Sequence, residues 1–342
     1  MTRPYKRLYV PVDNSGHSFA AIDLAVDLAG RLSARILGSH FLQAGGEDSC
    51  LGLLEESCRA AGVPFERRGV DGAPHRLITE DIRQSHCDLV VMGALGDGAV
   101  DSSQIGSVAE RVARRSGVDV LVVRDLVPPD LVPDGQAQIL AAVDGSEASL
   151  RALGAALALG RATSRRVAGV VVGDGALAGR PSAAVDAARA AARQHDEDVD
   201  LVITEGKPFD RLLKLCFERR PWLLVLGRAG ADADGHGEDV EEMGSTASNM
   251  VRMSPCNVLV TSSTGAPRSP GAHAHRRAAT PAPPAPPRAM RWMPDAEALL
   301  EDVPTEQRGT MIRAVEDGAR RMGIKVITAD AIDRVMLGPM QS

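Results

Sequence analysis

The chain repeats itself, and this internal repeat constrains its fold more than any other feature. Four residues near the start recur 131 positions later: Asp13, Ser15, Ser18 and Ala25 return as Asp144, Ser146, Ser149 and Ala156. Further along, Gly106 and Ser107 recur as Gly244 and Ser245, so the offset has grown to 138. Insertions in surface loops produce such a drift between two copies of one fold. The sequence therefore predicts two similar domains in tandem.

Each copy alternates short apolar runs with helical patterns. In the first copy, strands are expected at 7–12, 35–41, 64–69, 88–92 and 119–123, and helices near 16–32, 48–61, 74–85 and 106–116. In the second copy, strands are expected at 138–143, 166–172, 199–204, 222–226 and 257–261, and helices near 147–162, 182–195, 207–219 and 245–253. Runs such as DLVVMG are apolar throughout, which is typical of strands buried on both faces of a parallel sheet. The pattern predicts two doubly wound, five-stranded parallel sheets, a Rossmann-like α/β fold.

Composition matters here for what it excludes. The five cysteines form no CxxC pair, which argues against a zinc site, a Cys-ligated iron–sulfur cluster and a disulfide framework. No apolar run approaches the roughly 18 residues of a membrane helix, and the first apolar stretch ends too soon for a signal peptide. A net charge of −6 disfavours general nucleic-acid binding, because phosphate neutralisation dominates that affinity. We expect a cytoplasmic protein with reduced thiols that binds neither membranes nor nucleic acids.

A change of composition divides the rest of the chain. Residues 265–290 are rich in Pro and Ala and contain no acidic residue. Such a segment cannot bury enough apolar surface to offset its ordering entropy, so we expect a disordered linker. The sequence predicts four parts: a first domain at 1–127, a second at 134–264, the linker at 265–290 and a small helical domain at 291–338. In this tail a helix is expected from Pro304 to Met322, with Ile312 and Val315 in its apolar stripe.

A glycine-rich loop follows the fourth predicted strand of the first copy. Gly93, Gly96, Gly106 and Ser107 give the spacing G-x2-G-x9-G-S. Doubly wound folds bind ligands where such a loop leaves the carboxyl end of a strand. The helix that begins near Ser107 presents free N–H groups and a positive dipole end, which suit an anion. Asp13, at the end of the first strand, faces the same crevice. Glycines after a strand also make ordinary turns, but the recurrence of this loop in the second copy favours a binding loop.

The corresponding loop of the second copy has diverged. Thirteen residues, rather than nine, separate Gly230 from Gly244, and six of them are Asp or Glu. These carboxylates would repel a triphosphate. A calcium loop of the EF-hand type fails as well, because His236 and Met243 occupy ligand positions. The sequence therefore predicts that the second copy is degenerate and mainly structural.

The two motifs together resemble the universal stress protein family, which shows V-x-V-D-x-S at its first strand and G-x2-G-x9-G-[S/T] before its last helix. The resemblance covers roughly residues 3–126 and 136–263. It implies that ATP, with Mg²⁺, binds in the first copy. The binding residues that it implies are Pro11, Val12, Asp13, Phe41, Gly93, Gly96, Gly106, Ser107 and Val108. The loop differs from an ideal phosphate site in one respect, since between Gly96 and Gly106 it carries Asp97 and Asp101 but no Lys or Arg.

The tail resembles a different family, namely the small C-terminal domain of the B subunit of light-independent protochlorophyllide reductase. The matching residues are Trp292, Ala296, Pro304, Arg308, Gly309, Glu316, Ala319, Arg320, Gly323, Ile327 and Thr328. In that family the domain lies near the tetrapyrrole pocket of a nitrogenase-like enzyme, whose large catalytic body has no counterpart here. The resemblance therefore implies a module that docks on an unknown protein or a tetrapyrrole, rather than reductase activity.

Two functions stay open at this point. The first is a non-catalytic regulatory protein of the universal stress type, with its two copies paired edge to edge through their last strands as an intramolecular pseudo-dimer. The alternative is an accessory subunit in (bacterio)chlorophyll or other tetrapyrrole biosynthesis. The sequence contains no Ser/His/Asp order, no Walker-type loop and no HExxH, so it predicts no catalytic residue and no metal ligand. Slow ATP hydrolysis, a third possibility, lacks an identifiable base, and we do not expect an enzyme.

Overall fold

The structure is a computed structural model with two compact units, Met1–Pro270 and Gly271–Ser342. In the first unit it describes residues 5–13, 15–42, 49–71, 74–95, 105–124, 138–173, 181–230 and 243–262. In the second it describes residues 291–292, 308, 312, 315 and 326–327. The predicted linker at 265–290 lies outside the described residues.

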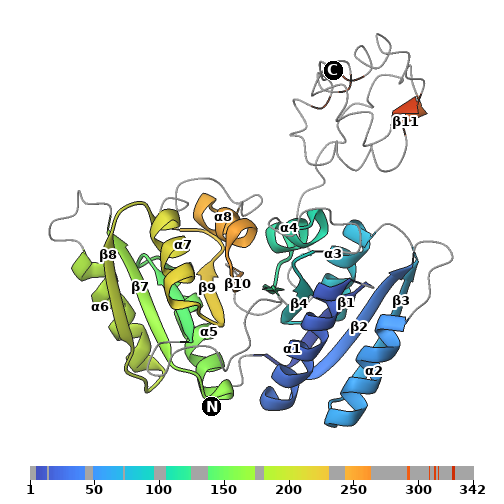
Figure 1. The fold of residues 1–342 in the computed structure, drawn as a ribbon, viewed down its shortest axis with the longest axis horizontal. Coiled ribbons are helices and arrows are strands. Elements are labelled where there is room, and N and C mark those ends of the chain that lie inside the picture. The colour runs from blue at the N-terminus through green and yellow to red at the C-terminus, as the bar shows by residue number, and fades with distance from the viewer. Residues whose placement is uncertain are drawn as a thin grey trace, which may run out of the picture. The chain divides into compact units, whose positions relative to one another are not determined.

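The first repeat is a parallel sheet with helices on both faces (Figure 1). Its strands are β1 (Arg7–Val12), β2 (Arg35–Leu42), β3 (Phe65–Asp71), β4 (Leu89–Gly93) and β5 (Asp119–Val123). Its helices are α1 (Gly16–Leu32), α2 (Ser49–Ala61), α3 (Pro74–Ser85) and α4 (Ser107–Arg115). The strand order β3-β2-β1-β4-β5 places the switch point, where doubly wound folds bind ligands, between β1 and β4.

The second repeat has the same architecture. Its strands are β6 (Ile139–Val143), β7 (Val167–Gly173), β8 (Asp200–Glu205), β9 (Leu223–Gly227) and β10 (Asn257–Thr261). Its helices are α5 (Glu147–Thr163), α6 (Pro181–Gln194), α7 (Pro208–Arg219) and α8 (Ser245–Met253). The order β10-β9-β6-β7-β8 mirrors that of the first repeat. The prediction of two tandem, parallel, doubly wound sheets is confirmed.

Each sheet has a hydrophobic core on both of its faces. In β4, Leu89 and Val91 belong to the core beneath α1 and α2, while Val90 and Met92 belong to the core beneath α3 and α4. All four side chains are buried. This two-sided burial is the reason why the strands appear in the sequence as continuous apolar runs rather than as alternating patterns.

The two repeats share one ten-stranded sheet, because β5 pairs with β10. This pairing is antiparallel and brings Leu121 opposite Leu259. The ends of the pair are fixed by side chains at equivalent positions of the two repeats. The N–H of Arg124 donates to Oδ1 of Asn257 at 2.8 Å, and the N–H of Ser262 donates to Oδ1 of Asp119 at 2.8 Å.

Two buried arginines also cross this junction. Arg228, just after β9, donates from Nη1 to the carbonyl oxygen of Arg114 at 3.1 Å. Arg124, just after β5, donates from Nη2 to the carbonyl oxygen of Val251 at 3.0 Å. Each guanidinium therefore lies at the C-terminal end of the other repeat's last helix, where unpaired carbonyl groups and the helix dipole favour a cation.

Asp119 makes the junction sensitive to pH. Its carboxylate accepts hydrogen bonds from the Tyr5 hydroxyl at 2.7 Å and from Ser262. Burial raises the pKa of Asp119 more than these hydrogen bonds lower it. A carboxyl group whose pKa is higher in the folded state stabilises the fold below its unfolded pKa of about 3.9. This contribution is lost as the pH rises through the folded value.

We therefore expect Asp119→Asn, which copies Asn257 of the second repeat, to change how stability depends on pH. Because the amide does not titrate, the free energy of unfolding of the variant, relative to the native chain, should increase as the pH rises from about 4. Urea denaturation at several pH values measures this difference. A difference that is constant with pH would contradict the prediction.

In the second unit, β11 (Arg291–Trp292) pairs in parallel with β12 (Val326–Ile327). The expectation of an all-α tail is wrong in this respect. Val326 and Ile327 are β-branched, and such residues favour extended backbone. Arg308, Ile312 and Val315 are helical, and Val315 is fully buried, as the predicted apolar stripe requires.

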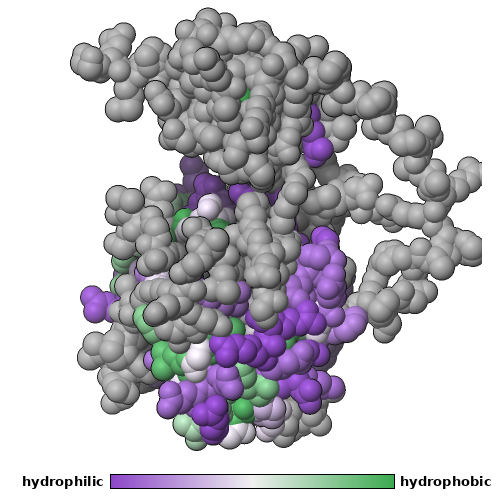
Figure 2. Space-filling view, turned by 90° about the vertical axis from the view of Figure 1, so that its right-hand side faces the viewer, coloured by the Kyte–Doolittle hydropathy of each residue, from purple (hydrophilic) through white to green (hydrophobic). Residues whose placement is uncertain are grey.

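The surface of the described residues is mixed in character. Figure 2 shows polar and apolar side chains interspersed on one face, with the polar ones predominating. None of the helices that the structure describes is both long enough and apolar enough to cross a membrane.

Candidate functional site

Asp13 follows β1 and organises the residues at the start of α1. Its Oδ1 atom accepts hydrogen bonds from the hydroxyls of Ser15 at 2.5 Å and Ser18 at 2.6 Å, and from the N–H of Ser15 at 3.0 Å. Ser15 is the N-cap of α1 and accepts the N–H of Ser18 at 3.2 Å. The carboxylate predicted to face the crevice is thus held in a fixed orientation by its neighbours, and the first turn of α1 already has a side-chain cap.

The same serine joins α1 to the glycine-rich loop. The Ser15 Oγ atom also lies 3.1 Å from the carbonyl oxygen of Leu95, which is a second acceptor for the single hydroxyl proton that Asp13 accepts at 2.5 Å. Two residues earlier, Gly93 ends β4 against the same turn of α1. A Cβ atom at Gly93 would lie 2.8 Å from the carbonyl carbon of His17 and 2.9 Å from its carbonyl oxygen. Real side chains do not approach backbone atoms so closely, so only glycine fits here.

Gly227 in the second repeat has the same environment. A Cβ atom there would lie 2.8 Å from the carbonyl carbon of Ala148, at the start of α5. The first glycine of each loop is therefore required by the packing of a strand against a helix. This requirement exists without any ligand, which explains why the glycine is present even in the diverged loop of the second repeat.

The N-terminus of α4 differs from that of α1, because its N-cap residue has no side chain that could accept a hydrogen bond from the helix. Its N-cap is Gly106, whose own N–H donates to the carbonyl oxygen of Ala94 at 2.7 Å and so joins the two ends of the loop. The N–H groups of the first helical residues, Ser107 and Val108, have no acceptor within the helix. An uncapped helix start of this kind attracts anions through these donors and through its dipole.

The second repeat builds its last helix in the same way. Gly244 is the N-cap of α8, and its N–H donates to the carbonyl oxygen of Arg228 at 2.8 Å. The helix start is therefore duplicated, whereas the acidic loop in front of it is not. The loop residues 231–242, like residues 96–104 of the first repeat, lie outside the described part of the chain.

The structure describes eight of the nine predicted binding residues. The ends of β1 and β4 and the start of α4 contribute Pro11, Val12, Asp13, Gly93, Gly106, Ser107 and Val108. Phe41 is the second-last residue of β2 and pairs with Val70, so its backbone is part of the same sheet edge. Gly96 lies outside the described residues, together with Asp97 and Asp101.

The burial of Val12 limits how this residue could contact a ligand. Its side chain is 3% exposed and packs in the core beneath α1 and α2, so only its backbone is available to a ligand.

His17 lies beside Gly93, and its buried Nδ1 atom has no hydrogen-bond partner among the described residues. Among all the residues that the structure describes, no three His, Cys, Asp or Glu side chains are grouped so that they could hold a metal ion.

Comparison with known proteins agrees with this geometry. Residues 38–124 and 137–262 match the model of the universal stress protein family. A universal stress protein of Methanocaldococcus jannaschii is 27% identical over 141 residues, which cover 35% of this chain and 82% of the relative. The structure of a putative universal stress protein from Pseudomonas aeruginosa covers 76% of this chain and 94% of its own, at 17% identity and a TM-score of 0.57. A solved universal stress protein in complex with cAMP is 31% identical, and the match covers 35% of this chain and 98% of that protein, with a TM-score of 0.32.

Proposed function

Because this chain belongs to the universal stress protein family, we propose that it is a non-catalytic regulatory protein that binds ATP in its first repeat. The observation that carries this proposal is the uncapped start of α4, which lies at the same sheet edge as the oriented carboxylate of Asp13. This pairing offers backbone donors to phosphates and a carboxylate to ribose hydroxyls at the switch point of a doubly wound sheet.

The ligand would lie along this edge. The N–H groups of Ser107 and Val108 would bind phosphate oxygens, and Asp13 with the backbone of Pro11, Val12 and Phe41 would bind the adenosine end. Mg²⁺ would be held chiefly by the phosphates and would reduce their repulsion from Asp97 and Asp101. We propose binding without turnover, because the sequence contains no Ser/His/Asp order, no Walker-type loop and no HExxH.

The first test is the identity of the ligand that the purified chain retains. We expect denaturation of the purified protein to release an adenine nucleotide, identified by mass spectrometry, at about one molecule per chain. Calorimetric titration of nucleotide-free protein with ATP and Mg²⁺ should give the same stoichiometry. Absence of both retained nucleotide and ATP binding would refute the proposal.

We propose further that the two repeats act as an intramolecular pseudo-dimer. The antiparallel pairing of β5 with β10 and the exchange of Arg124 and Arg228 between the repeats support this. In such an arrangement each repeat covers the sheet edge of the other, so neither is left with an open strand at the junction.

The tail is proposed as a docking module, with the domain limits predicted from sequence at 291–338. Its helical stripe, of which Val315 is buried, indicates a small folded unit, and units below about 50 residues are marginally stable alone. Affinity capture with the full chain, compared with a chain ending at residue 264, tests this. A partner captured only by the full chain would support docking, and recovery of a tetrapyrrole or of a tetrapyrrole enzyme would favour the alternative function.

A further inference from the structure

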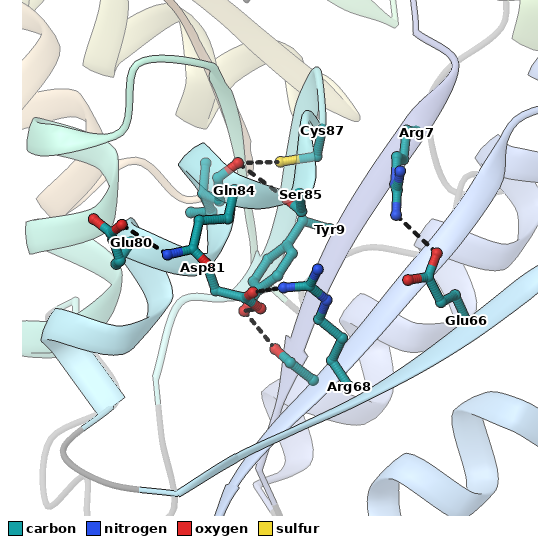
Figure 3. A network of polar contacts seen from close by, with 11 residues as sticks. Arg7, Tyr9, Glu66, Arg68, Glu80, Asp81, Gln84, Ser85 and Cys87 are labelled. Carbon is teal, nitrogen blue, oxygen red and sulfur yellow. Dashed lines mark hydrogen bonds and ion pairs between the residues drawn. The ribbon is translucent and has the colours of Figure 1, made fainter. Parts of the chain in front are cut away.

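A buried polar network crosses three strands of the first repeat and one helix (Figure 3). Ser39 on β2 donates from Oγ to the hydroxyl oxygen of Tyr9 on β1 at 2.8 Å. The Tyr9 hydroxyl in turn donates to Oδ2 of Asp81 on α3 at 2.8 Å. The other carboxylate oxygen of Asp81 accepts a hydrogen bond from the guanidinium of Arg68 on β3.

The network is largely buried, and Arg68, whose side chain is 32% exposed, lies at its edge. Tyr9 and Ser39 are fully buried, and Asp81 is 7% exposed. Burial raises the pKa of the Tyr9 hydroxyl and the Asp81 carboxylate raises it further, so the hydroxyl remains a donor at physiological pH. Placing such groups in a core has a free-energy cost that hydrogen bonds and the ion pair only partly offset.

The second repeat shows that the fold itself does not need this network. Strand register and helix position give the equivalents of Tyr9, Ser39, Arg68 and Asp81 as Leu140, Val170, Val202 and Leu215. All four equivalents are apolar: Leu140 and Val170 belong to one buried hydrophobic cluster, and Val202 and Leu215 pack against it. Within one chain, the same sheet face is thus built once with a polar network and once without it. The repeat that has the network is the one whose loop keeps the G-x2-G-x9-G-S spacing.

The network lies next to the backbone that is proposed to bind the adenosine end. Ser39 pairs in register with Pro11, and Tyr9 precedes Pro11 by two residues, so their side chains share one sheet face. Phe41 follows Ser39 by two residues on the same strand. The backbone at Pro11, which would bind the adenosine end, therefore lies at the level of Ser39 and Arg68, and Tyr9 lies two residues below it.

We propose that Tyr9, Ser39, Arg68 and Asp81 are positioning residues for the nucleotide site of the first repeat. They join β1, β2, β3 and α3 at and just below the level of Pro11, so that the backbone at Pro11 and Phe41 is held in its binding geometry before the ligand arrives. This inference rests on the proposed binding of ATP and adds the reason why the first repeat would bind it. Preformed sites bind more tightly because less ordering is needed on association.

The test transfers the apolar character of the second repeat to the first. The variant combines Tyr9→Phe, Ser39→Val, Arg68→Val and Asp81→Leu, and Phe is used at position 9 to keep the ring volume. Well-packed apolar replacements of buried charges are often neutral or stabilising, so the melting temperature should not fall. The affinity for ATP and Mg²⁺, measured by calorimetry, should nevertheless fall at least tenfold. A merely structural role would lower stability and leave affinity unchanged.

The matched control is an ion pair that joins β1 to β3, two of the strands that the network also joins. Arg7 on β1 and Glu66 on β3 are 2.7 Å apart (Figure 3), near the opposite ends of their strands. Arg7→Gln combined with Glu66→Gln should leave the affinity within twofold of the native value. If the four-residue variant fails to fold, Tyr9→Phe alone, which removes one oxygen, should still weaken binding by threefold or more.

Failure of this inference is distinguishable from failure of the proposed function. Native protein that binds ATP, with network variants that bind equally well, would overturn the positioning role alone. If the native chain binds no ATP, the network is tested by amide hydrogen exchange at residues 12–13 and 39–42. If the network positions this backbone, these amides should exchange faster in the network variant than in the Arg7/Glu66 control variant. Equal exchange rates in the two variants would overturn the positioning role.

Discussion

Replacing Gly106 with valine should abolish ATP binding, whereas the same replacement at Gly244 should leave it unchanged. A branched side chain at the N-cap of α4 would stand where the phosphates approach the N–H groups of Ser107 and Val108. Gly244 caps α8 behind an acidic loop that we propose does not bind nucleotide. Calorimetric titration of both variants with ATP and Mg²⁺ measures the difference.

The two substitutions are well matched as folding controls. Gly106 has φ −68° and ψ 147°, and Gly244 has φ −56° and ψ 154°, which are backbone conformations open to any residue. A Cβ atom at Gly244 would have its nearest neighbour, the carbonyl oxygen of Arg228, at 3.6 Å. Both variants should therefore fold, as circular dichroism would show. Two equal sites in the native protein, or retained binding in Gly106→Val, would refute the assignment to the first repeat.

Gly93→Ala should lower the free energy of unfolding by about 1–3 kcal/mol, the typical cost of overpacking a core. The new methyl group would lie 2.8 Å from the carbonyl carbon of His17. Because this atom belongs to the backbone at the start of α1, the strand and the helix would have to separate to admit the methyl group. Urea denaturation followed by circular dichroism measures the loss.

Gly30→Ala supplies the matched control for this change. Gly30 lies within α1, and a Cβ atom there would have no neighbour within 4 Å. Alanine should stabilise the helix by up to roughly 1 kcal/mol, because glycine is the poorer helix former. Replacing glycine with alanine is thus expected to lower the free energy of unfolding at Gly93, which packs against α1, and to raise it at Gly30, which lies within α1. Equal effects at the two positions would show that the His17 contact does not explain Gly93.

The fold was predictable because its signals are local. The apolar runs at 88–92 and 119–123 predicted strands that the structure places at Leu89–Gly93 and Asp119–Val123. Such runs occur only where both faces of a strand are covered, so they also predicted the parallel sheet. The duplication of Asp13 as Asp144 predicted a second copy of the same fold without any knowledge of contacts between the copies.

Part of the site was predictable for the same reason. Asp13 and Gly106 each lie next to a recognisable strand end or helix start, and carboxyl ends of parallel strands meet at one edge of a sheet. The sequence could not distinguish a glycine that faces a ligand from one that faces protein. The loop spacing predicts that Gly93 contacts a ligand. In the structure, the backbone of His17, 76 residues earlier, leaves no room for a side chain at position 93.

The tertiary structure alone decided which charged residues are buried. In the sequence, Arg228 and Asp81 look like ordinary surface residues, because a charge in a polar segment is usually solvated. Asp81 reaches Tyr9 across 72 residues, and Arg228 reaches Arg114 across 114. Local patterns specify which segments form strands and helices. The partners of a buried charge depend on which distant segments pack together, and this is fixed only when the two repeats and their helices come together in the folded chain.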